Sequence, residues 1–188
     1  MKKLFTLLFL LLTFNHAWAD DYVIDTKGYH AFVQFKISHL GYSWLYGRFD
    51  VFSGEFSYDE QQPEKATINM TVQTNSVNTN NPARDKHLRS DDFLDVANHP
   101  TASFESTSFE PTLNGHGTMK GNLTINGVTQ PIELDVNFIG AGKDPWGGER
   151  RGYEATTELT LENFKIKKSI NGAYQTLFLT VSVEGIKK

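Results

Sequence analysis

Acidic, basic and hydroxyl side chains gather in one short stretch, Ala83–Asp95, which reads ARDKHLRSDDFLD. Covalent catalysis needs a nucleophile, a base and a group that orients the base, all within hydrogen-bonding reach. His87 and Ser90 are three residues apart, a spacing that brings side chains together on a helix. The stretch therefore supports one hypothesis, an enzyme that acts through His87, Asp85 and Arg84.

The residues on either side of this stretch favour a structural helix instead. Asn81 is a good N-cap and Pro82 a good first residue, so a helix is predicted to begin there. Ser90 is better explained as the cap of a second short helix, which His99-Pro100 ends. No Gly-x-Ser-x-Gly motif accompanies this serine. We therefore expect no catalytic residue here, and the enzyme hypothesis remains the less favoured alternative.

The charged residues of the predicted helix can be assigned structural roles. Asp85 and Arg89 are four residues apart, which predicts an exposed ion pair along one helix face. Arg84 and His87 are expected either to tether this segment to the rest of the fold or to contact the head group of a ligand.

Metal and phosphate sites have little support in the sequence. The chain has no cysteine, and His30, His39, His87, His99 and His116 show no H-x-H, H-x-x-H or H-E-x-x-H spacing. The glycine-rich segment Gly140–Gly152 lacks the G-x-x-x-x-G-K-[ST] pattern of a phosphate-binding loop. We expect no metal site and no catalytic site, and we interpret the glycine-rich segment as a long hairpin loop.

Apolar and polar residues alternate along most of the chain, which predicts β-strands. These strands must therefore position the side chains described above. In PIELDVNFIG, for example, Ile132, Leu134, Val136 and Phe138 share one face. A short strand is predicted near Tyr22–Asp25. The long strands are predicted at 30–38, 47–58, 65–74, 101–109, 116–126, 128–140, 151–162 and 174–185.

Eight antiparallel strands of this length favour a closed barrel, because closure removes exposed sheet edges. The predicted fold is therefore an all-β, eight-stranded antiparallel barrel with one short helical insertion between the third and fourth strands. Asn126-Gly127 predicts a two-residue type I′ hairpin that pairs Ile125 with Val128. A phase slip predicts a bulge near Asp50–Phe52. Whether side chains fill the barrel or line a pocket stays open, since such barrels do either.

Two aromatic-rich segments are expected near an opening of the barrel. His39–Phe49 contains Tyr42, Trp44 and Tyr46 and is predicted to link two strands, where a core stripe should be ending. Trp146 lies in the glycine-rich loop and either caps the barrel or packs on its own loop.

The first 19 of the 188 residues have the pattern of a secretory signal peptide. Lys2 and Lys3 precede an apolar run, and Ala17-Trp18-Ala19 predicts cleavage after Ala19. Residues 20–188 should then form a single exported domain, in the periplasm of a bacterium. Without the two lysines the net charge falls from −4 to −6, which disfavours nucleic acid or an anionic membrane surface as a partner of the chain as a whole.

Four motifs resemble the YceI-like family of exported bacterial proteins, and the resemblance covers essentially all of residues 20–188. In order, they are AFVQFKISHLGYSWLYGRF, ARDKHLRSDDFLDVANHPTASFES, LTINGVTQPI and DPWGGERRGYEA. The resemblance implies a lipocalin-like barrel that binds a long isoprenoid chain, such as a polyprenyl diphosphate or the tail of a ubiquinone, in an elongated pore. It also implies an association with stress responses and no established catalytic activity.

Together with the strand phases, this resemblance predicts the ligand-binding residues. The wall residues are expected to be Phe35, Ile37, Phe56, Met70, Phe104, Met119, Leu123, Leu134, Val136 and Leu159, and the mouth residues Leu40, Trp44, Phe93 and Trp146. No cofactor is expected apart from a bound isoprenoid lipid or quinone. Exchange of lipid with a membrane is compatible with this function, and the oligomeric state stays open, a dimer included.

Three functions are therefore distinguished. The first is a periplasmic carrier of isoprenoid lipids, the second an enzyme acting on a lipid-linked substrate at the barrel mouth, and the third a stress or interaction module whose barrel is filled by its own side chains. The first is favoured because alternation supplies apolar walls, whereas no group of residues supplies chemistry.

Overall fold

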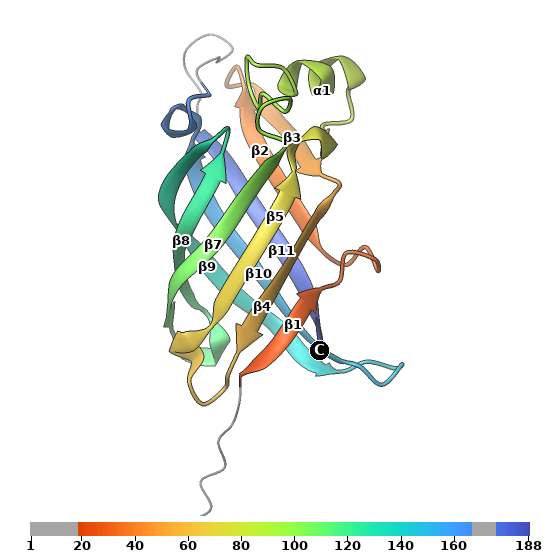
Figure 1. Cartoon of the computed structure of the whole chain (residues 1–188), viewed down its shortest axis with the longest axis vertical. Coiled ribbons are helices and arrows are strands. Elements are labelled where there is room, and N and C mark those ends of the chain that lie inside the picture. Colours follow the sequence, from red (N-terminus) through yellow and green to blue (C-terminus); the bar gives the residue numbers. More distant parts are fainter. Residues whose placement is uncertain (1–18, 167–175) are drawn as a thin grey trace, which may run out of the picture.

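The protein forms an antiparallel β-barrel in the computed structural model, which describes residues 19–166 and 176–188 (Figure 1). Its strands are β1 (Asp20–Ile24), β2 (Phe32–His39), β3 (Ser43–Phe49), β4 (Phe52–Tyr58), β5 (Thr67–Gln73), β6 (Val77–Asn78), β7 (Thr101–Pro111), β8 (Gly117–Ile125), β9 (Val128–Lys143), β10 (Glu149–Thr160) and β11 (Thr176–Lys187). They follow the order β1-β4-β5-β7-β8-β9-β10-β11-β2-β3-β6, and pairing of β1 with β11 closes the sheet.

Two positions in the barrel are each occupied by two successive strands. Both β1 and β2 pair with β11, at Ile24↔Gly185 and Phe32↔Ser182. In the same way β3 pairs with β2, while β4 pairs with β1. When each succession is taken as one strand, the described residues form the predicted eight-stranded closed barrel, and the two-residue strand β6 extends it beside β3.

The predicted hairpin is confirmed, whereas the strand predicted at 47–58 is interrupted where the bulge was predicted. Asn126 and Gly127 have φ values of 51° and 69°, and Ile125 pairs with Val128 across the turn. At the predicted bulge β3 ends at Phe49 and β4 begins at Phe52. The peptide groups between them are not left unpaired. The Asp50 N–H donates to the Ser76 carbonyl (3.1 Å), and the Val51 carbonyl accepts from the Gln73 N–H (2.9 Å).

The prediction that His39–Phe49 links two strands is wrong. Instead, β2 ends at His39, β3 begins at Ser43, and the two pair along their whole length as a hairpin. The turn between them places Leu40 and Gly41 at φ values of 56° and 78°. Leucine rarely adopts such a conformation, so this turn carries no usual sequence signal.

The helical insertion is shorter than predicted. Helix α1 (Pro82–Leu88) begins as expected, because the Asn81 side chain accepts from the backbone N–H groups of Ala83 and Arg84. The second helix, capped by Ser90, is wrong: turns follow α1, and the Ser90 hydroxyl donates to the His87 carbonyl (2.7 Å). Within the described residues, no helix has the length and hydrophobicity needed to cross a membrane.

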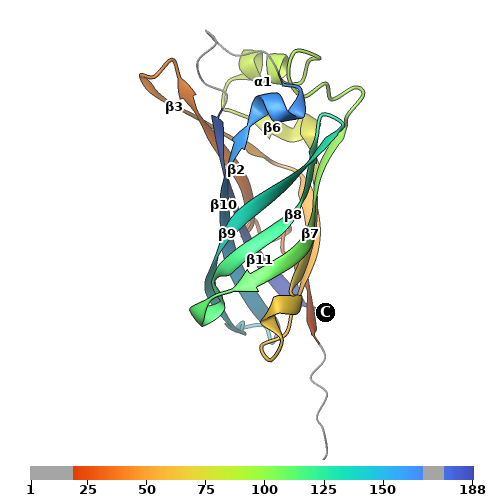
Figure 2. The ribbon, with the colours of Figure 1, turned by 90° about the vertical axis from the view of Figure 1, so that its left-hand side faces the viewer.

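The insertion lies over one end of the barrel, and the opposite end carries β1 and the loop between β9 and β10 (Figures 1 and 2). We refer to these as the α1 end and the β1 end. Most of the apolar side chains that the strand alternation predicts to face the interior do so, and they form two clusters of buried side chains. A binding site is therefore expected in the interior of the barrel, between the two ends.

Candidate functional site

A large apolar cavity occupies the half of the barrel nearest the α1 end. Its volume is about 400 Å³, within the range of pockets that hold small ligands. Side chains from opposite sides of the barrel line it, among them Phe35 and Phe49 from the β2–β3 hairpin and Leu159 from β10. This cavity settles the question left open by the sequence, because the barrel is not filled by its own side chains.

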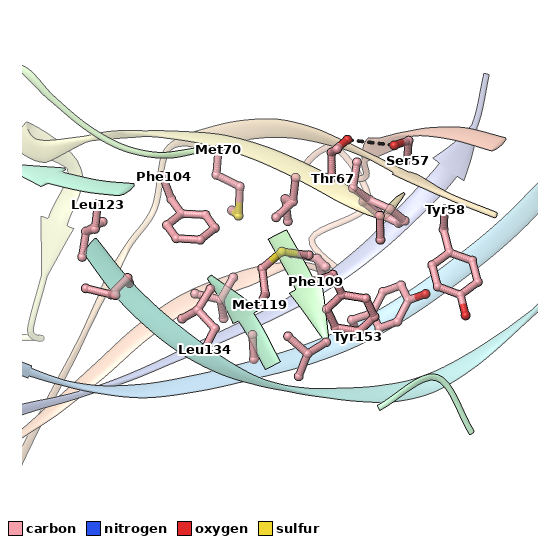
Figure 3. A pocket seen from close by; sticks show the side chains of 18 of the residues that line it. Ser57, Tyr58, Thr67, Met70, Phe104, Phe109, Met119, Leu123, Leu134 and Tyr153 are labelled. Atoms are coloured by element: carbon pink, nitrogen blue, oxygen red, sulfur yellow. Dashed lines mark hydrogen bonds between the residues drawn. The ribbon is translucent and has the colours of Figure 1, made fainter. Parts of the chain in front are cut away.

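A second cavity of about 100 Å³ continues toward the β1 end (Figure 3). It is lined by Phe109, Met119 and Leu134, and it ends near Tyr58 and Tyr153. The two cavities share five lining residues, which are Met70, Phe104, Leu123, Leu179 and Val181. We therefore regard them as two parts of one elongated lumen that narrows where these five side chains meet.

Glycines in neighbouring strands help to keep this lumen open. A Cβ atom at Gly121 would lie 2.4 Å from the Phe104 ring, and one at Gly47 would lie 2.2 Å from the Phe35 ring. Each phenylalanine ring therefore covers a glycine instead of crossing the interior. A larger residue at either glycine would force the ring away from the wall.

The polar end of the lumen is built around Thr79. Its backbone N–H and its hydroxyl both donate to the Asp85 carboxylate, which is buried. Arg84 binds the same residue, since its Nε donates to the Thr79 hydroxyl (2.8 Å) and its Nη2 to the Thr79 carbonyl (2.7 Å). Arg84 thus takes the tethering role foreseen for it, and it also lines the large cavity.

The predicted exposed pair of Asp85 with Arg89 is wrong. Asp85 faces Thr79, whereas Arg89 reaches back to the carbonyls of Asn75 (2.7 Å) and Val77 (2.9 Å). Both side chains satisfy backbone groups of the segment that precedes α1. Leaving a backbone group unpaired costs more folding free energy than an exposed ion pair contributes.

His87 also borders the large cavity, but its surroundings do not form a catalytic triad. Its Nε2 lies 2.9 Å from Asp92 Oδ2, and its ring meets Phe93 edge-on with centroids 5.0 Å apart. The Ser90 hydroxyl donates to the His87 carbonyl and not to the imidazole. The serine–histidine contact considered from the sequence is therefore not made.

At the β1 end a buried arginine sits among aromatic rings. The Arg151 guanidinium lies 3.9 Å from the centre of the Tyr58 ring and 4.8 Å from that of Phe138. Its Nε donates to the Tyr153 hydroxyl (2.7 Å), and its Nη1 donates to the exposed carboxylate of Glu60 (3.2 Å). We call these residues the arginine–tyrosine cluster, and it closes the narrow end of the lumen.

Burial in this cluster raises the pKa of Tyr153 to about 12, from an ordinary value of 10, although the nearby Arg151 charge opposes the shift. The unfolded chain should therefore ionise first, and this contribution to stability should be present below pH 10 and lost between pH 10 and 12. We expect the free energy of unfolding to fall by about 2–3 kcal/mol over that interval. Urea unfolding across this pH range measures the fall, and Tyr153→Phe should reduce it. An equal fall in that variant would assign the effect to other groups.

This barrel and its sequence match those of known proteins. The YceI-like domain matches residues 22–185. The chain is 54% identical to the UPF0312 protein of Ectopseudomonas mendocina, over 93% of this chain and 91% of the relative. The chain belongs to the YceI-like family.

Solved structures agree with this family assignment. The YceI protein of Campylobacter jejuni is 31% identical, with a TM-score of 0.73 that covers 80% of this chain and 90% of that one. A polyisoprenoid-binding domain from Saccharophagus degradans is 15% identical, with a TM-score of 0.62 over 89% and 98% of the two chains, and at that identity it shows the fold alone.

In this YceI-like barrel, all but three of the predicted ligand-binding residues line the lumen. Those that do are Phe35, Ile37, Phe56, Met70, Phe93, Phe104, Met119, Leu123, Leu134, Val136 and Leu159, together with Arg84 and His87. Their part in binding a ligand remains a prediction. The strand residues among them share one reason for their position, since alternation along a closed barrel directs every second side chain inward. Phe93, Arg84 and His87 belong instead to the insertion over the α1 end.

Leu40, Trp44 and Trp146 lie outside the lining of either cavity. Leu40 belongs to the tight turn between β2 and β3. Trp44 is on the outer face of β3, where it meets Phe178 edge-on. Trp146 is 80% exposed in the β9–β10 loop, with the Arg150 guanidinium 5.9 Å from the centre of its ring, so it does not cap the barrel.

The arginine–tyrosine cluster was missed in the sequence, although a signal for it exists. Arg151 is in phase with Tyr153 and Ala155, whose side chains line the lumen. A charged residue on an apolar face is normally assumed to point outward. The available indication was a group of three tyrosines at positions 22, 58 and 153. Each lies on the inward face of its strand, near the strand end, and a tyrosine hydroxyl there indicates a buried polar partner.

One group of possible metal ligands lies outside the lumen. Ligand atoms of Asp25, His30 and Glu184 are within 4.8 Å of one another. However, Arg150 Nη1 already donates to Asp25 Oδ2 (2.8 Å) and to Glu184. The arginine holds this acidic group together and lowers the pKa of Asp25, chiefly through that hydrogen bond. The absence of a metal site remains a prediction.

Proposed function

We propose that this protein binds a single long isoprenoid chain inside its barrel and carries it without changing it. The observation that supports this proposal most strongly is the elongated apolar lumen, with about 400 Å³ in its wide part and 100 Å³ in its narrow part. Thr79, Arg84 and His87 line the wide part and lie together at the α1 end. An isoprenoid tail in the lumen would place its head group at that end. The solved barrel from Saccharophagus degradans, which is described as polyisoprenoid-binding, supports the choice of ligand class.

The tail should contribute more to affinity than the head group. Each methylene-sized group buried contributes about 0.8 kcal/mol. A charge-assisted contact of the head group with Arg84 or His87 contributes about 1.5–3 kcal/mol, which is the contribution of about two to four buried methylene-sized groups. Ordering a flexible tail removes part of the gain, but the remaining benefit still increases with the length that is buried.

Binding without catalysis is part of the same proposal. The Ser90 hydroxyl and the Asp85 carboxylate are both engaged in holding the backbone near α1. The His87 imidazole pairs with the exposed carboxylate of Asp92. A lumen with apolar walls and no assembled nucleophile suits retention of a lipid better than its chemical conversion. The leader-like first 19 residues support export to the periplasm, where such a carrier would move lipid between membranes.

Native mass spectrometry of the protein purified from its host tests this function directly. We expect a co-purifying mass that matches an isoprenoid lipid or quinone. We also expect affinity to rise by about tenfold or more with each added isoprene unit, until the lumen is filled. A series in which affinity does not depend on tail length would refute the proposal. An empty barrel that binds none of the tails would favour an interaction module.

A further inference from the structure

The outer face and the turn of the β2–β3 hairpin carry large aromatic side chains that stay exposed in the described part of the chain. Tyr42 is 87% exposed, Tyr46 64% and Trp44 46%. The alternation of β3 turns Leu45, Gly47 and Phe49 toward the interior, and so directs Trp44 and Tyr46 outward. Exposed aromatic residues gathered on one projecting element usually mark an interaction surface.

This aromatic face lies beside the wide end of the lumen. The hairpin projects at the α1 end of the barrel (Figure 2). Two residues of the hairpin, Ser38 and Tyr46, also contribute atoms to the lining of the large cavity. A surface that held the hairpin would therefore lie directly next to the wide end of the lumen.

The charge of the hairpin differs from that of the whole chain. Phe32–Phe49 contains Lys36 and Arg48 and no acidic residue, whereas the chain as a whole carries a net charge of −4. Arg48 pairs with Asp50, which directly follows the hairpin (Nε to Oδ1, 2.6 Å), so Lys36 is the cation that this face offers to a partner. Lys36 Nζ lies 4.8 Å from the centre of the Trp44 ring and 5.2 Å from that of Phe178. The outer face thus combines amphipathic rings with a cation that packs against them.

This combination fits a lipid–water interface. Tryptophan and tyrosine are enriched at the level of lipid head groups, because one part of each ring is apolar and the other part forms hydrogen bonds. Lysine near an anionic surface adds about 1 kcal/mol of attraction. A protein partner would more often be recognised by a buried apolar centre with a polar rim, whereas these rings spread along a projecting tip.

We propose that Tyr42, Trp44, Tyr46 and Lys36 form a docking surface for the interface of an anionic membrane. Docking there would hold the wide end of the lumen against the bilayer, so that an isoprenoid tail passes between the two with little exposure to water. The inference rests on the proposed function for its purpose, but vesicle binding can be measured without any isoprenoid ligand.

Flotation with vesicles of phosphatidylglycerol and phosphatidylcholine in equal amounts tests the proposal. Combining Tyr42→Ser with Trp44→Ser should reduce the bound fraction about tenfold or more. Trp146→Ser removes a tryptophan that is more exposed than Trp44 but lies in the β9–β10 loop at the β1 end, and it should leave the bound fraction unchanged. Vesicles of phosphatidylcholine alone should bind less of the unsubstituted protein, because the attraction to Lys36 is lost.

Two further measurements keep the outcomes separate. Thermal unfolding confirms that both variants fold, and titration with a short soluble prenyl ligand should give the same affinity for both, since Tyr42 and Trp44 lie outside the lumen lining. Equal vesicle binding by all proteins would overturn the docking proposal. A hairpin variant that changes oligomeric state and not vesicle binding would also overturn it, and would assign the face to a second copy of the chain. If the protein binds vesicles through the hairpin but binds no prenyl ligand, the docking surface stands and the carrier function fails.

Discussion

Leu123→Asp is expected to abolish the binding of isoprenoid lipids. Leu123 is 7% exposed and lines both parts of the lumen, where the wide part meets the narrow one. A carboxylate placed there has no cationic partner among the residues that line the narrow part, and its desolvation would cost several kcal/mol. We expect the variant to retain no co-purifying lipid and to bind prenyl ligands at least a hundredfold more weakly.

A matched control is available on the same strand. Asn122→Asp adds the same charge one residue away, where the side chain is exposed on the outer face, and lipid binding should be unchanged. If Leu123→Asp does not fold, Leu123→Trp replaces it, at a cost in stability of about 1–3 kcal/mol. Leu123→Trp should narrow the lumen where its two parts meet, and it should weaken the binding of long tails more than that of short ones. Tight binding of a long tail by either Leu123 variant would show that the ligand does not occupy the lumen.

Arg151→Ala is expected to lower the free energy of unfolding by about 2–4 kcal/mol. The substitution removes the stacking of the guanidinium on Tyr58 and Phe138 and leaves the Tyr153 hydroxyl without its donor. It also creates a void at the narrow end of the lumen. Urea unfolding near neutral pH measures the loss.

Two conservative variants separate charge from shape at this position. Arg151→Met keeps much of the volume and avoids burying a charge, so it should cost less than Arg151→Ala. Arg151→Lys keeps the charge but cannot stack as a plane, so it should not restore stability. If Arg151→Ala changed stability by less than about 0.5 kcal/mol, the arginine–tyrosine cluster would contribute nothing measurable to holding the end of the barrel closed.

The sequence could predict the barrel itself because strand alternation is a local property. Successive side chains of a strand point to opposite faces, so Leu134 and Val136 had to share a face whatever their partners were. The Asn126-Gly127 turn is equally local, because it depends on the φ values that two adjacent residues can adopt. The capping of α1 by Asn81 is a third example. Each of these predictions is confirmed in the structure.

Predictions that depended on more than strand alternation, turn dipeptides and helix caps were less successful. The link expected at His39–Phe49 is a hairpin whose turn places Leu40 at an unusual φ value, and so Trp44 points outward. Asp85 was expected at the surface but binds Thr79, six residues away. Only the folded structure shows that a neighbouring backbone N–H needs this carboxylate.

By itself, therefore, the sequence determined that the chain folds as a closed antiparallel barrel and which side chains face its interior, because both follow from alternation and turn chemistry along the chain. The tertiary structure decided that the interior is hollow. Phe35 and Phe104 lie over Gly47 and Gly121 of neighbouring strands, which keeps both rings against the wall, and Arg151 stacks on Tyr58, which is distant in sequence. Such meetings depend on strand register and on closure of the sheet, which bring together residues that no local pattern connects.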